Sequence, residues 1–320
     1  MKTKILISTM IIVLSLTSCE KGFVETNGQL QVKGVQLVNR TGDPIVLRGL
    51  SYGWHNWWPR FYNEGTVKWL KEDWKVTVVR TALGVGVNSE NAYFQNPDFS
   101  LEKIEAVING AINEDIYVII DWHSHQIFRE EAVDFFSKMA KKYGHHPHII
   151  YEIFNEPVHN SWEEVKAYSM EIIQAIRQFD PDNIILVGSP HWDQDVHLAA
   201  DDPLTGFDNI MYSLHFYART HKQWLRERGD YALAKGLPLF VSECASMEAS
   251  GDGPLDFAEF DAWIDWMEKH KISWVTWSLA DKDESCSVLY PSSASDGNWN
   301  EEDLKESGKL NREKFRVYNP

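Results

Sequence analysis

Cysteine is scarce in this chain of 320 residues, which contains only Cys19, Cys244 and Cys286. So few thiols exclude the disulfide framework that stabilises many small secreted domains. Cys19 follows an apolar N-terminal segment, so Cys244 and Cys286 are the two that remain for the folded part. Outside the cytoplasm these two could pair, and the sequence leaves both a disulfide and two free thiols open.

Basic residues are also in deficit, since 31 Lys and Arg stand against 47 Asp and Glu, for a formal net charge of −16. This charge would repel nucleic acid and anionic membrane surfaces, which are therefore not expected as partners. The chain also lacks a linker rich in proline or serine and any obvious internal repeat. Tryptophan, by contrast, is abundant, with 14 residues. Indole rings can cover the flat C–H faces of neutral ligands such as sugars.

The longest apolar run stands at the N-terminus, from Ile5 to Leu16, and is preceded by Lys2 and Lys4. It is too short for a stable transmembrane helix and has the pattern of a secretory signal peptide. The segment Leu-Thr-Ser-Cys that ends at Cys19 resembles the bacterial lipobox, in which the cysteine is acylated and becomes the mature N-terminus. Cys19 is therefore the expected lipidation site.

These features predict three parts: a lipoprotein signal peptide at 1–18, a polar tether at 19–28 and a single domain at 29–320. The protein would be secreted across the inner membrane and would touch a membrane only through its lipid anchor. Nothing in the sequence requires more than a monomer.

From residue 45 onward, short apolar runs rich in Val and Ile alternate with amphipathic helical patterns. Such runs predict a parallel sheet covered by helices on both faces. Eight strand–helix units in about 250 residues suit an α/β fold of the (β/α)8 TIM-barrel type. No Gly-rich phosphate loop follows any strand, which disfavours an open doubly wound sheet. Residues 30–49 predict a short N-terminal β-hairpin that closes the bottom of the barrel. The expected strands are 45–51, 76–81, 116–122, 149–156, 183–188, 209–217, 238–243 and 272–278.

Polar or aromatic side chains stand where several of these strands end, and in a barrel such ends converge on one mouth. Glu156 and Glu243 would face each other there. Glycoside hydrolysis generally requires two carboxyl groups in one pocket. The full set of such residues is Arg80, His123, Asn155, Glu156, His215, Tyr217, Glu243 and Trp277.

The run IIYEIFNEP, residues 149–157, contains a second glutamate, Glu152. On one strand Glu152 and Glu156 would lie about 13 Å apart, so Glu152 is expected low in the barrel as a structural residue with a buried partner. Arg80 and Tyr217 would hold Glu243 as a carboxylate. Glu156, in apolar surroundings, would keep its proton longer.

The motifs IYVIIDWHSH, HIIYEIFNEP, MYSLHFYART, PLFVSE and ISWVTWSLADKDES resemble the retaining cellulases of glycoside hydrolase family 5, and the similarity runs from about Leu30 to Trp299. The resemblance implies a TIM barrel that cleaves β-1,4-glucan internally, with net retention of anomeric configuration and without a cofactor. It makes Glu156 the acid/base and Glu243 the nucleophile.

The same resemblance implies roles for other residues around the two carboxyls. Arg80 and Tyr217 would orient the nucleophile, and His215 would contact the acid/base. Asn155 would bind the sugar 2-hydroxyl. The remaining sugar contacts would come from His123, Trp277, Lys282, Glu284 and, on the leaving-group side, Trp192.

Two positions depart from the family pattern. Relatives often carry a histidine where this chain has Gly53, so either His55 substitutes from a shifted loop or Trp54 replaces the contact, and Trp54 is preferred. Cys244 stands where many relatives have tryptophan, and a disulfide to Cys286 would brace the mouth.

The remaining tryptophans divide into two groups. Trp69, Trp74, Trp263 and Trp266 are expected in the core, and Trp57, Trp58 and Trp299 near the cleft.

A metal site is the main alternative for the histidine clusters, but no catalytic metal is expected. His123-Ser124-His125 follows the third strand, whereas the H-x-H pattern of metal-dependent barrels belongs to the first. Residues 145–148 precede their strand and so lie at the opposite face.

Two other functions stay open at this point. A β-mannanase or mixed-linkage glucanase would use the same barrel fold. A surface glycan-binding lipoprotein would keep the tryptophans but would have no need for both carboxylates.

Overall fold

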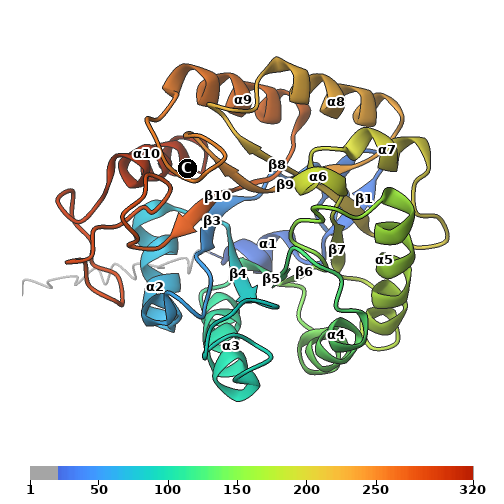
Figure 1. Ribbon diagram of the computed structural model, residues 1–320, viewed down its shortest axis with the longest axis horizontal. Coiled ribbons are helices and arrows are strands. Elements are labelled where there is room, and N and C mark those ends of the chain that lie inside the picture. Colours follow the sequence, from blue (N-terminus) through green and yellow to red (C-terminus); the bar gives the residue numbers. More distant parts are fainter. Residues whose placement is uncertain (1–20, 320) are drawn as a thin grey trace, which may run out of the picture.

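The eight expected apolar runs form the strands of a closed parallel barrel in the computed structural model, which describes residues 21–319 (Figure 1). The predicted signal peptide and Cys19 lie outside the described residues. The barrel order is β10-β3-β4-β5-β6-β7-β8-β9. The strands are β3 (Arg48–Tyr52), β4 (Val78–Gly84), β5 (Tyr117–His123), β6 (Ile149–Glu152), β7 (Ile184–Val187), β8 (Ile210–Tyr217), β9 (Leu239–Ala245) and β10 (Trp274–Leu279).

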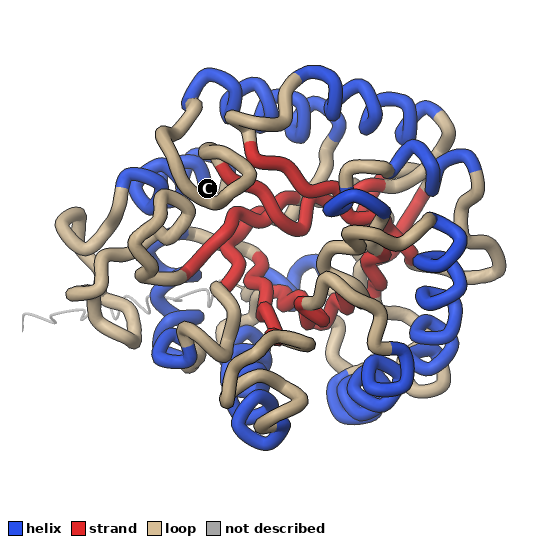
Figure 2. Tube along the Cα trace, viewed as in Figure 1, coloured by secondary structure: helices blue, strands red, loops and turns tan. Residues whose placement is uncertain are grey.

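Helices surround this barrel as an outer ring, which Figure 2 shows in blue around the red strands. The predicted (β/α)8 fold is thereby confirmed. The longer helices are α3 (Pro97–Asn113), α4 (Arg129–Tyr143), α5 (Trp162–Arg177), α8 (Gln223–Ala234), α9 (Phe257–His270) and α10 (Glu306–Tyr318). The shorter ones are η1 (Pro59–Phe61), α2 (Glu64–Trp69) with its continuation η2 (Leu70–Trp74), α6 (Pro190–Asp193) and α7 (Val196–Asp201).

Local sequence explains where these helices begin and which face they bury. Ser161 caps α5 with a capping box, since its hydroxyl accepts from the Glu164 amide and the Glu164 side chain accepts from the Ser161 amide. In α4 the buried side chains Ala132, Phe135, Phe136, Met139, Ala140 and Tyr143 recur every three or four residues, which places them on one face against the barrel.

The expected hairpin is formed by β1 (Gln31–Lys33) and β2 (Gln36–Val38), which pair antiparallel. Gly34 lies in the turn at a φ of 60°, a conformation that glycine adopts readily. Leu30 and Leu37 pack with side chains from the first residues of the barrel strands, including Tyr117 and Ile184. The hairpin therefore closes the bottom of the barrel.

The expected tether is wrong in part, because residues Phe23–Asn27 form a helix, α1. Val24 is only 2% exposed, and its amide donates to the Asp115 carbonyl at 3.2 Å. Burial of an apolar side chain fixes this segment against the domain. Within residues 21–319, no helix combines the length and the apolar character needed to cross a membrane.

Trp299 is also placed differently from the prediction. It is 2% exposed and packs edge-on against Phe61 and Trp74, so it belongs to the core rather than to the cleft. Its indole N–H donates to the Ala294 carbonyl at 2.7 Å. An aromatic residue in a polar loop thus folds back under that loop.

Candidate active site

The C-terminal strand ends surround a cavity of about 410 Å³ at the mouth of the barrel. It contains Glu156, from the loop after β6, and both His215 and Tyr217, from the end of β8. This is the face where TIM barrels carry their functional groups. The full lining is His125, Glu156, Trp192, Gln194, His215, Tyr217, His221 and Ala249.

Glu156 and Glu243 meet in this site although they are far apart in the chain. Glu243 lies on β9, directly opposite His215 in the β8–β9 register. A carboxylate oxygen of Glu156 and one of Glu243 lie within 4.8 Å of each other and of a ring nitrogen of His215. Both carboxyls are buried.

Glu243 is held by donors on both of its oxygens. Arg80 Nη1 donates to Oε2 at 3.0 Å, and the Tyr217 hydroxyl donates to Oε1 at 2.8 Å. Burial raises the pKa of Glu243, as does the charge of Glu156, while Arg80 acts to lower it. Burial also raises the pKa of Tyr217 well above its ordinary value, so its hydroxyl keeps its proton and remains a donor.

Arg80 is the centre of a buried charge network beneath the two carboxyls. Its guanidinium donates to Glu152 Oε2 at 2.5 Å and to Asn155 Oδ1 at 2.6 Å, and it pairs with Asp121 Oδ2 at 3.0 Å. Burial opposes its charge, but Asp121, Glu152 and Glu243 keep it protonated. Glu152 therefore has the buried partner that the sequence predicts.

Glu156 lies between two histidines, and the expectation of apolar surroundings is wrong. His215 Nδ1 lies 3.0 Å from Oε1, and His125 Nε2 lies 3.2 Å from Oε2. Burial would raise the pKa of Glu156, but hydrogen bonds and charge from the two rings outweigh it and lower the pKa to about 2. Glu156 is therefore ionised near neutral pH, which reverses the expected order of the two carboxyls.

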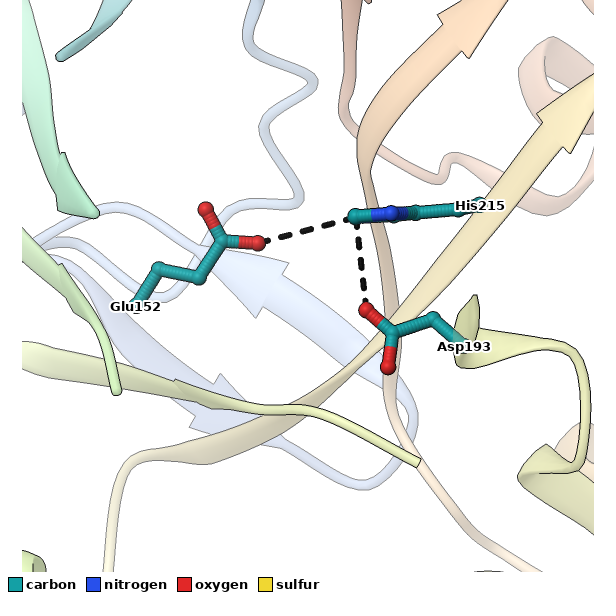
Figure 3. A group of neighbouring side chains, drawn as sticks. All are labelled: Glu152, Asp193 and His215. Carbon is teal, nitrogen blue, oxygen red and sulfur yellow. Dashed lines mark ion pairs between the residues drawn. The ribbon is translucent and has the colours of Figure 1, made fainter. Parts of the chain in front are cut away.

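The predicted separation of Glu152 and Glu156 is wrong as well. Strand β6 ends at Glu152, and the chain then leaves the strand, so the two side chains reach opposite nitrogens of one imidazole. His215 Nε2 lies 3.6 Å from Glu152 Oε1 and 3.4 Å from Asp193 Oδ2, as Figure 3 shows. Burial would lower the pKa of His215, but Asp193, Glu152 and Glu156 raise it well above its ordinary value.

Two groups of side chains in the described chain bring possible metal ligands within 4.8 Å of one another. They are Glu152, Asp193 and His215, and Glu156, His215 and Glu243. Arg80 already binds Glu152 and Glu243, and the cationic ring of His215 contacts the other carboxylates. These positive charges compensate the carboxylates and would repel a metal ion. The absence of a catalytic metal remains a prediction.

Three more predicted residues adjoin the buried charge network around Arg80. Trp277 stacks on His123, with ring centroids 5.1 Å apart, and His123 Nδ1 contacts Asp121 Oδ2 at 2.6 Å. Asn155 Nδ2 is buried and finds no hydrogen-bond partner within residues 21–319. A buried donor without an acceptor is costly, so this amide is available to a ligand hydroxyl.

Of the two candidates in the first loop, only Trp54 reaches the mouth. Its ring lies 4.2 Å from that of His123 and 5.8 Å from that of His125. His55 does not line the site, since its ring is buried and contacts the Ser100 hydroxyl at 2.8 Å and the Gly84 amide at 2.9 Å. Histidine at this position therefore supports the loop from inside.

Trp192 lines the catalytic cavity and is 44% exposed. Lys282 and Glu284 form an ion pair with each other in the loop after β10, outside the lining of that cavity. Cys286 Sγ donates to Glu284 Oε1 at 3.2 Å.

The disulfide that was left open is not formed, because both cysteines of the described chain are free. Cys244 follows Glu243 on β9, and successive strand residues point to opposite faces. Its Sγ therefore points away from the mouth, where it donates to the Val275 carbonyl at 3.4 Å. Cys286 packs instead with Trp277 and Met247.

Sequence reasoning missed His125, Asp121 and Asp193. It also did not predict three residues of the cavity lining, which are Gln194, His221 and Ala249. His125 stands two residues after His123, so its even spacing from a strand-end histidine was a usable signal. Asp121 has the same parity as His123 on β5. Asp193 left no such signal, because it lies at the end of the short helix α6 and reaches His215 only through the fold.

Comparisons with known proteins agree with this geometry. A family model described as cellulase (glycosyl hydrolase family 5) matches residues 38–283. Endoglucanase A of Evansella cellulosilytica is 44% identical over 283 residues, which cover 86% of this chain and 57% of that protein. The chain thus spans little more than half the length of this relative.

Solved structures show the same barrel. One from Cytophaga hutchinsonii has a TM-score of 0.91 at 46% identity, and the alignment covers 93% of this chain and 98% of that one. The catalytic domain of Thermobifida fusca endoglucanase Cel5A, in complex with cellotetraose, has a TM-score of 0.86 at 32% identity and covers 92% and 100%. The match over most of its length shows that the chain belongs to glycosyl hydrolase family 5.

Proposed function

We propose that this protein is a retaining endo-β-1,4-glucanase that hydrolyses cellulose or a related β-glucan by double displacement. The observation that carries the proposal is the pair of carboxylate oxygens, on Glu156 and Glu243, within 4.8 Å. Retaining glycosidases hold their two carboxyl groups about 5–5.5 Å apart, whereas inverting enzymes leave room for a water between them.

The neighbours of each carboxyl support the division of roles. Glu243 contacts Arg80 and Tyr217, whose hydrogen bonds stabilise its carboxylate form, the form that attacks the anomeric carbon. Glu156 contacts two imidazoles that exchange protons. A proton that moves from either imidazolium to Glu156 turns it into the acid that protonates the departing oxygen.

In the second half of the reaction, Glu156 acts as the base. It removes a proton from the water that attacks the glycosyl–enzyme ester at Glu243, and the ester bond breaks to release the sugar. Asn155 Nδ2 would donate to the 2-hydroxyl of the sugar, an interaction that strengthens in the transition state. Trp277 and His123 would form the wall beside that sugar.

The substrate class follows from the family and from relatives. The Evansella relative is an endoglucanase, and the Thermobifida structure holds cellotetraose. Exposed indoles near the mouth, at Trp57 and Trp192, would stack on glucosyl rings. We propose a monomer that takes β-linked glucan as its partner.

Substitution of each carboxyl tests the mechanism. Glu243→Gln should lose at least about 10³-fold in kcat on carboxymethyl-cellulose, because the nucleophile is removed. Glu156→Ala should lose comparably on cellulose but far less on a 2,4-dinitrophenyl cellobioside, whose leaving group needs no proton, and azide should restore turnover as a glycosyl azide. Exposed Glu248→Gln is the matched control and should stay within about twofold.

The anomeric configuration of the first products can refute the proposed double displacement. Proton NMR of early products should show the β-anomer first, since two inversions give retention. An α-anomer first, or a Glu243→Gln enzyme as active as wild type, would refute double displacement at this pair. Barley β-glucan and glucomannan, assayed beside carboxymethyl-cellulose, rank the preferred polysaccharide.

We also propose that Cys19 carries a lipid anchor after export across the inner membrane. The support is the lipobox-like segment behind an apolar signal. Metabolic labelling with a palmitate analogue should tag the wild type, and Cys19→Ser should remove the label. A labelled Cys19→Ser protein would contradict the anchor.

A further inference from the structure

Helix α1 attaches the N-terminal segment to the bottom face of the barrel, the face at the N-terminal ends of the strands and opposite the mouth. This helix, Phe23–Asn27, lies behind the barrel strands in Figure 1. The amides of Val24 and Glu25 donate to Asp115, at 3.2 Å to its carbonyl and at 2.9 Å to its carboxylate. Asp115 precedes strand β5 and Val24 is buried, so α1 is fixed to the bottom face.

The proposed lipid anchor at Cys19 is close in sequence to this attachment. Residues 20–22 alone separate Cys19 from Phe23, the first residue of α1. Because an extended chain advances at most about 3.6 Å per residue, the two Cα atoms can lie at most about 14 Å apart. Helix α5, whose 16 residues extend about 24 Å between the two faces of the barrel, is longer than this reach. An anchor at Cys19 therefore holds the membrane near the bottom face and away from the mouth.

The surrounding helices make the two faces of the barrel differ in charge. In a (β/α)8 barrel each helix begins near the mouth and ends near the bottom. In α4, α5, α9 and α10 the first turn carries acidic residues and the last turn basic ones, an arrangement that suits the helix dipole. The acidic residues are Glu130, Glu131, Glu163, Glu164, Glu259 and Glu306. The basic residues are Lys141, Lys142, Arg177, Lys269 and Arg316.

The loops increase this difference in charge. The segment 280–306, which follows β10 at the mouth, has Lys282 and Lys305 as its basic residues. Its more numerous acidic residues are Asp281, Asp283, Glu284, Asp296, Glu301, Glu302, Asp303 and Glu306. At the bottom, Lys75 and Lys271 are exposed in the turns after η2 and α9, and neither forms an ion pair within residues 21–319. The formal charge of −16 is therefore concentrated near the mouth, which an anionic bilayer repels more strongly than the bottom face.

A groove of about 570 Å³ lies on the bottom face beside α1. Phe23 of α1 lines this groove together with Pro44 and Val46, which are also apolar and not buried. Lys71 and Lys75 line the same groove, and their long side chains can extend toward phosphate groups. Apolar side chains next to lysines suit the interface of a bilayer, where acyl chains meet headgroups.

We propose that the bottom face of the barrel rests on the phospholipid bilayer that holds the lipid anchor, so that the mouth opens away from the membrane. This inference rests on the proposed anchor at Cys19 and not on the proposed hydrolysis. The attachment of α1 limits the distance between the domain and the bilayer, and the groove beside α1 contacts the headgroups. The acidic residues near the mouth disfavour the opposite orientation. A long glucan chain can then lie across the mouth without contact with the membrane.

Collisional quenching of fluorescence in vesicles tests this orientation. The acylated full-length protein is reconstituted into vesicles of phosphatidylethanolamine and phosphatidylglycerol that contain a lipid with a nitroxide headgroup. A fluorophore is attached at His145→Cys, an exposed position before β6 at the bottom, or at Ser250→Cys, an exposed position after β9 at the mouth. Cys244 and Cys286 are buried, and the protein without either substitution measures their background labelling. Quenching should be about threefold stronger at His145→Cys, because only the bottom face lies within reach of the anchor.

A longer tether separates the two causes of this orientation. Insertion of about 20 Gly and Ser residues between Lys21 and Gly22 gives a flexible chain that spans about 25 Å, so the difference in quenching should fall by about half. Salt at about 0.5 M should remove the rest, because it screens the repulsion of the acidic mouth. A difference that the insertion leaves unchanged would overturn the short tether as its cause.

Two further results would contradict the inference at different levels. Equal quenching at the two positions without the insertion, or stronger quenching at Ser250→Cys, would overturn the orientation while the anchor stands. Protein that does not float with the vesicles would overturn the anchor and the orientation together. Hydrolysis of carboxymethyl-cellulose by the same sample reports on the proposed enzyme activity and is independent of both.

Discussion

At the scale of single residues, the two carboxyls differ in what their neighbours can do with a proton. Glu243 is bound by groups that only donate, and Glu156 by two imidazoles that can donate or accept. The two imidazoles keep Glu156 ionised, so they also have to supply the proton that the first step consumes. His215 is buried against three carboxylates, whereas His125 is partly exposed and can exchange with solvent.

We expect His125→Ala to move the alkaline limb of the kcat/KM profile to higher pH. The His125 ring lowers the pKa of Glu156, so its removal raises that pKa and leaves a larger fraction of Glu156 protonated at any given pH. The loss at the optimum should be about tenfold or less, since His215 remains. His145→Ala, an exposed histidine before β6, is the control. A limb that stays in place or moves to lower pH would contradict this role.

At the scale of elements, strands bring the site residues to one rim and loops decide how far they reach. Strand β6 stops at Glu152, and the following loop carries Asn155 and Glu156 over the mouth. Below that rim the backbones of β3 and β4 lie in close contact. A Cβ at Gly49 on β3 would lie 1.7 Å from the Val78 carbonyl oxygen on β4.

Gly49→Ala should therefore destabilise the barrel strongly. The two atoms nearest to the added methyl belong to the backbone of Val78, which pairs with Gly49 in the β3–β4 register, so we expect a loss of about 3 kcal/mol or more. Gly34→Ala in the hairpin turn is the comparison, because nothing lies within 4 Å and only its φ of 60° opposes a side chain. That change should cost about 1 kcal/mol. Urea unfolding of both variants measures the difference, and equal costs would show that β3 and β4 can separate freely.

At the scale of the whole molecule, the barrel interior holds an unusual concentration of charge. Arg80 and His215 face Asp121, Glu152 and Glu243 in the buried network. Removal of one partner leaves an uncompensated buried charge. The stability of the protein must therefore depend on pH through this network.

We expect the contribution of Glu152 to vanish in acid. Burial raises its pKa, but Arg80 and His215 lower it to about 2 from an ordinary 4.5. A pKa that is depressed in the folded state stabilises fully above 4.5 and is lost as the pH falls toward 2. The gap in unfolding free energy between wild type and Glu152→Gln should thus be widest near neutral pH and shrink below pH 4.5. A gap that is constant from pH 7 to 3, in urea titrations, would contradict the network as the cause.

The barrel and the rim that carries Glu156 and Glu243 followed from patterns that are local in the chain. Apolar runs of strand length, separated by amphipathic helices, indicate a (β/α)8 barrel without knowledge of any long-range contact. A polar residue at a strand end is then assigned to the mouth by topology alone. Glu152 could be identified as structural in the same way.

Contacts between distant segments needed the folded chain. The pairing of Glu156 with His125, the shared imidazole of Glu152 and Glu156, and the inward turn of Trp299 depend on where loops cross the barrel. The separate thiols of Cys244 and Cys286 reflect side-chain direction on β9. The hydrophobic periodicity of a sequence indicates which face of a helix or strand is buried. It does not indicate which groups from other elements contact that face. Such contacts between distant segments set the pKa of Glu156.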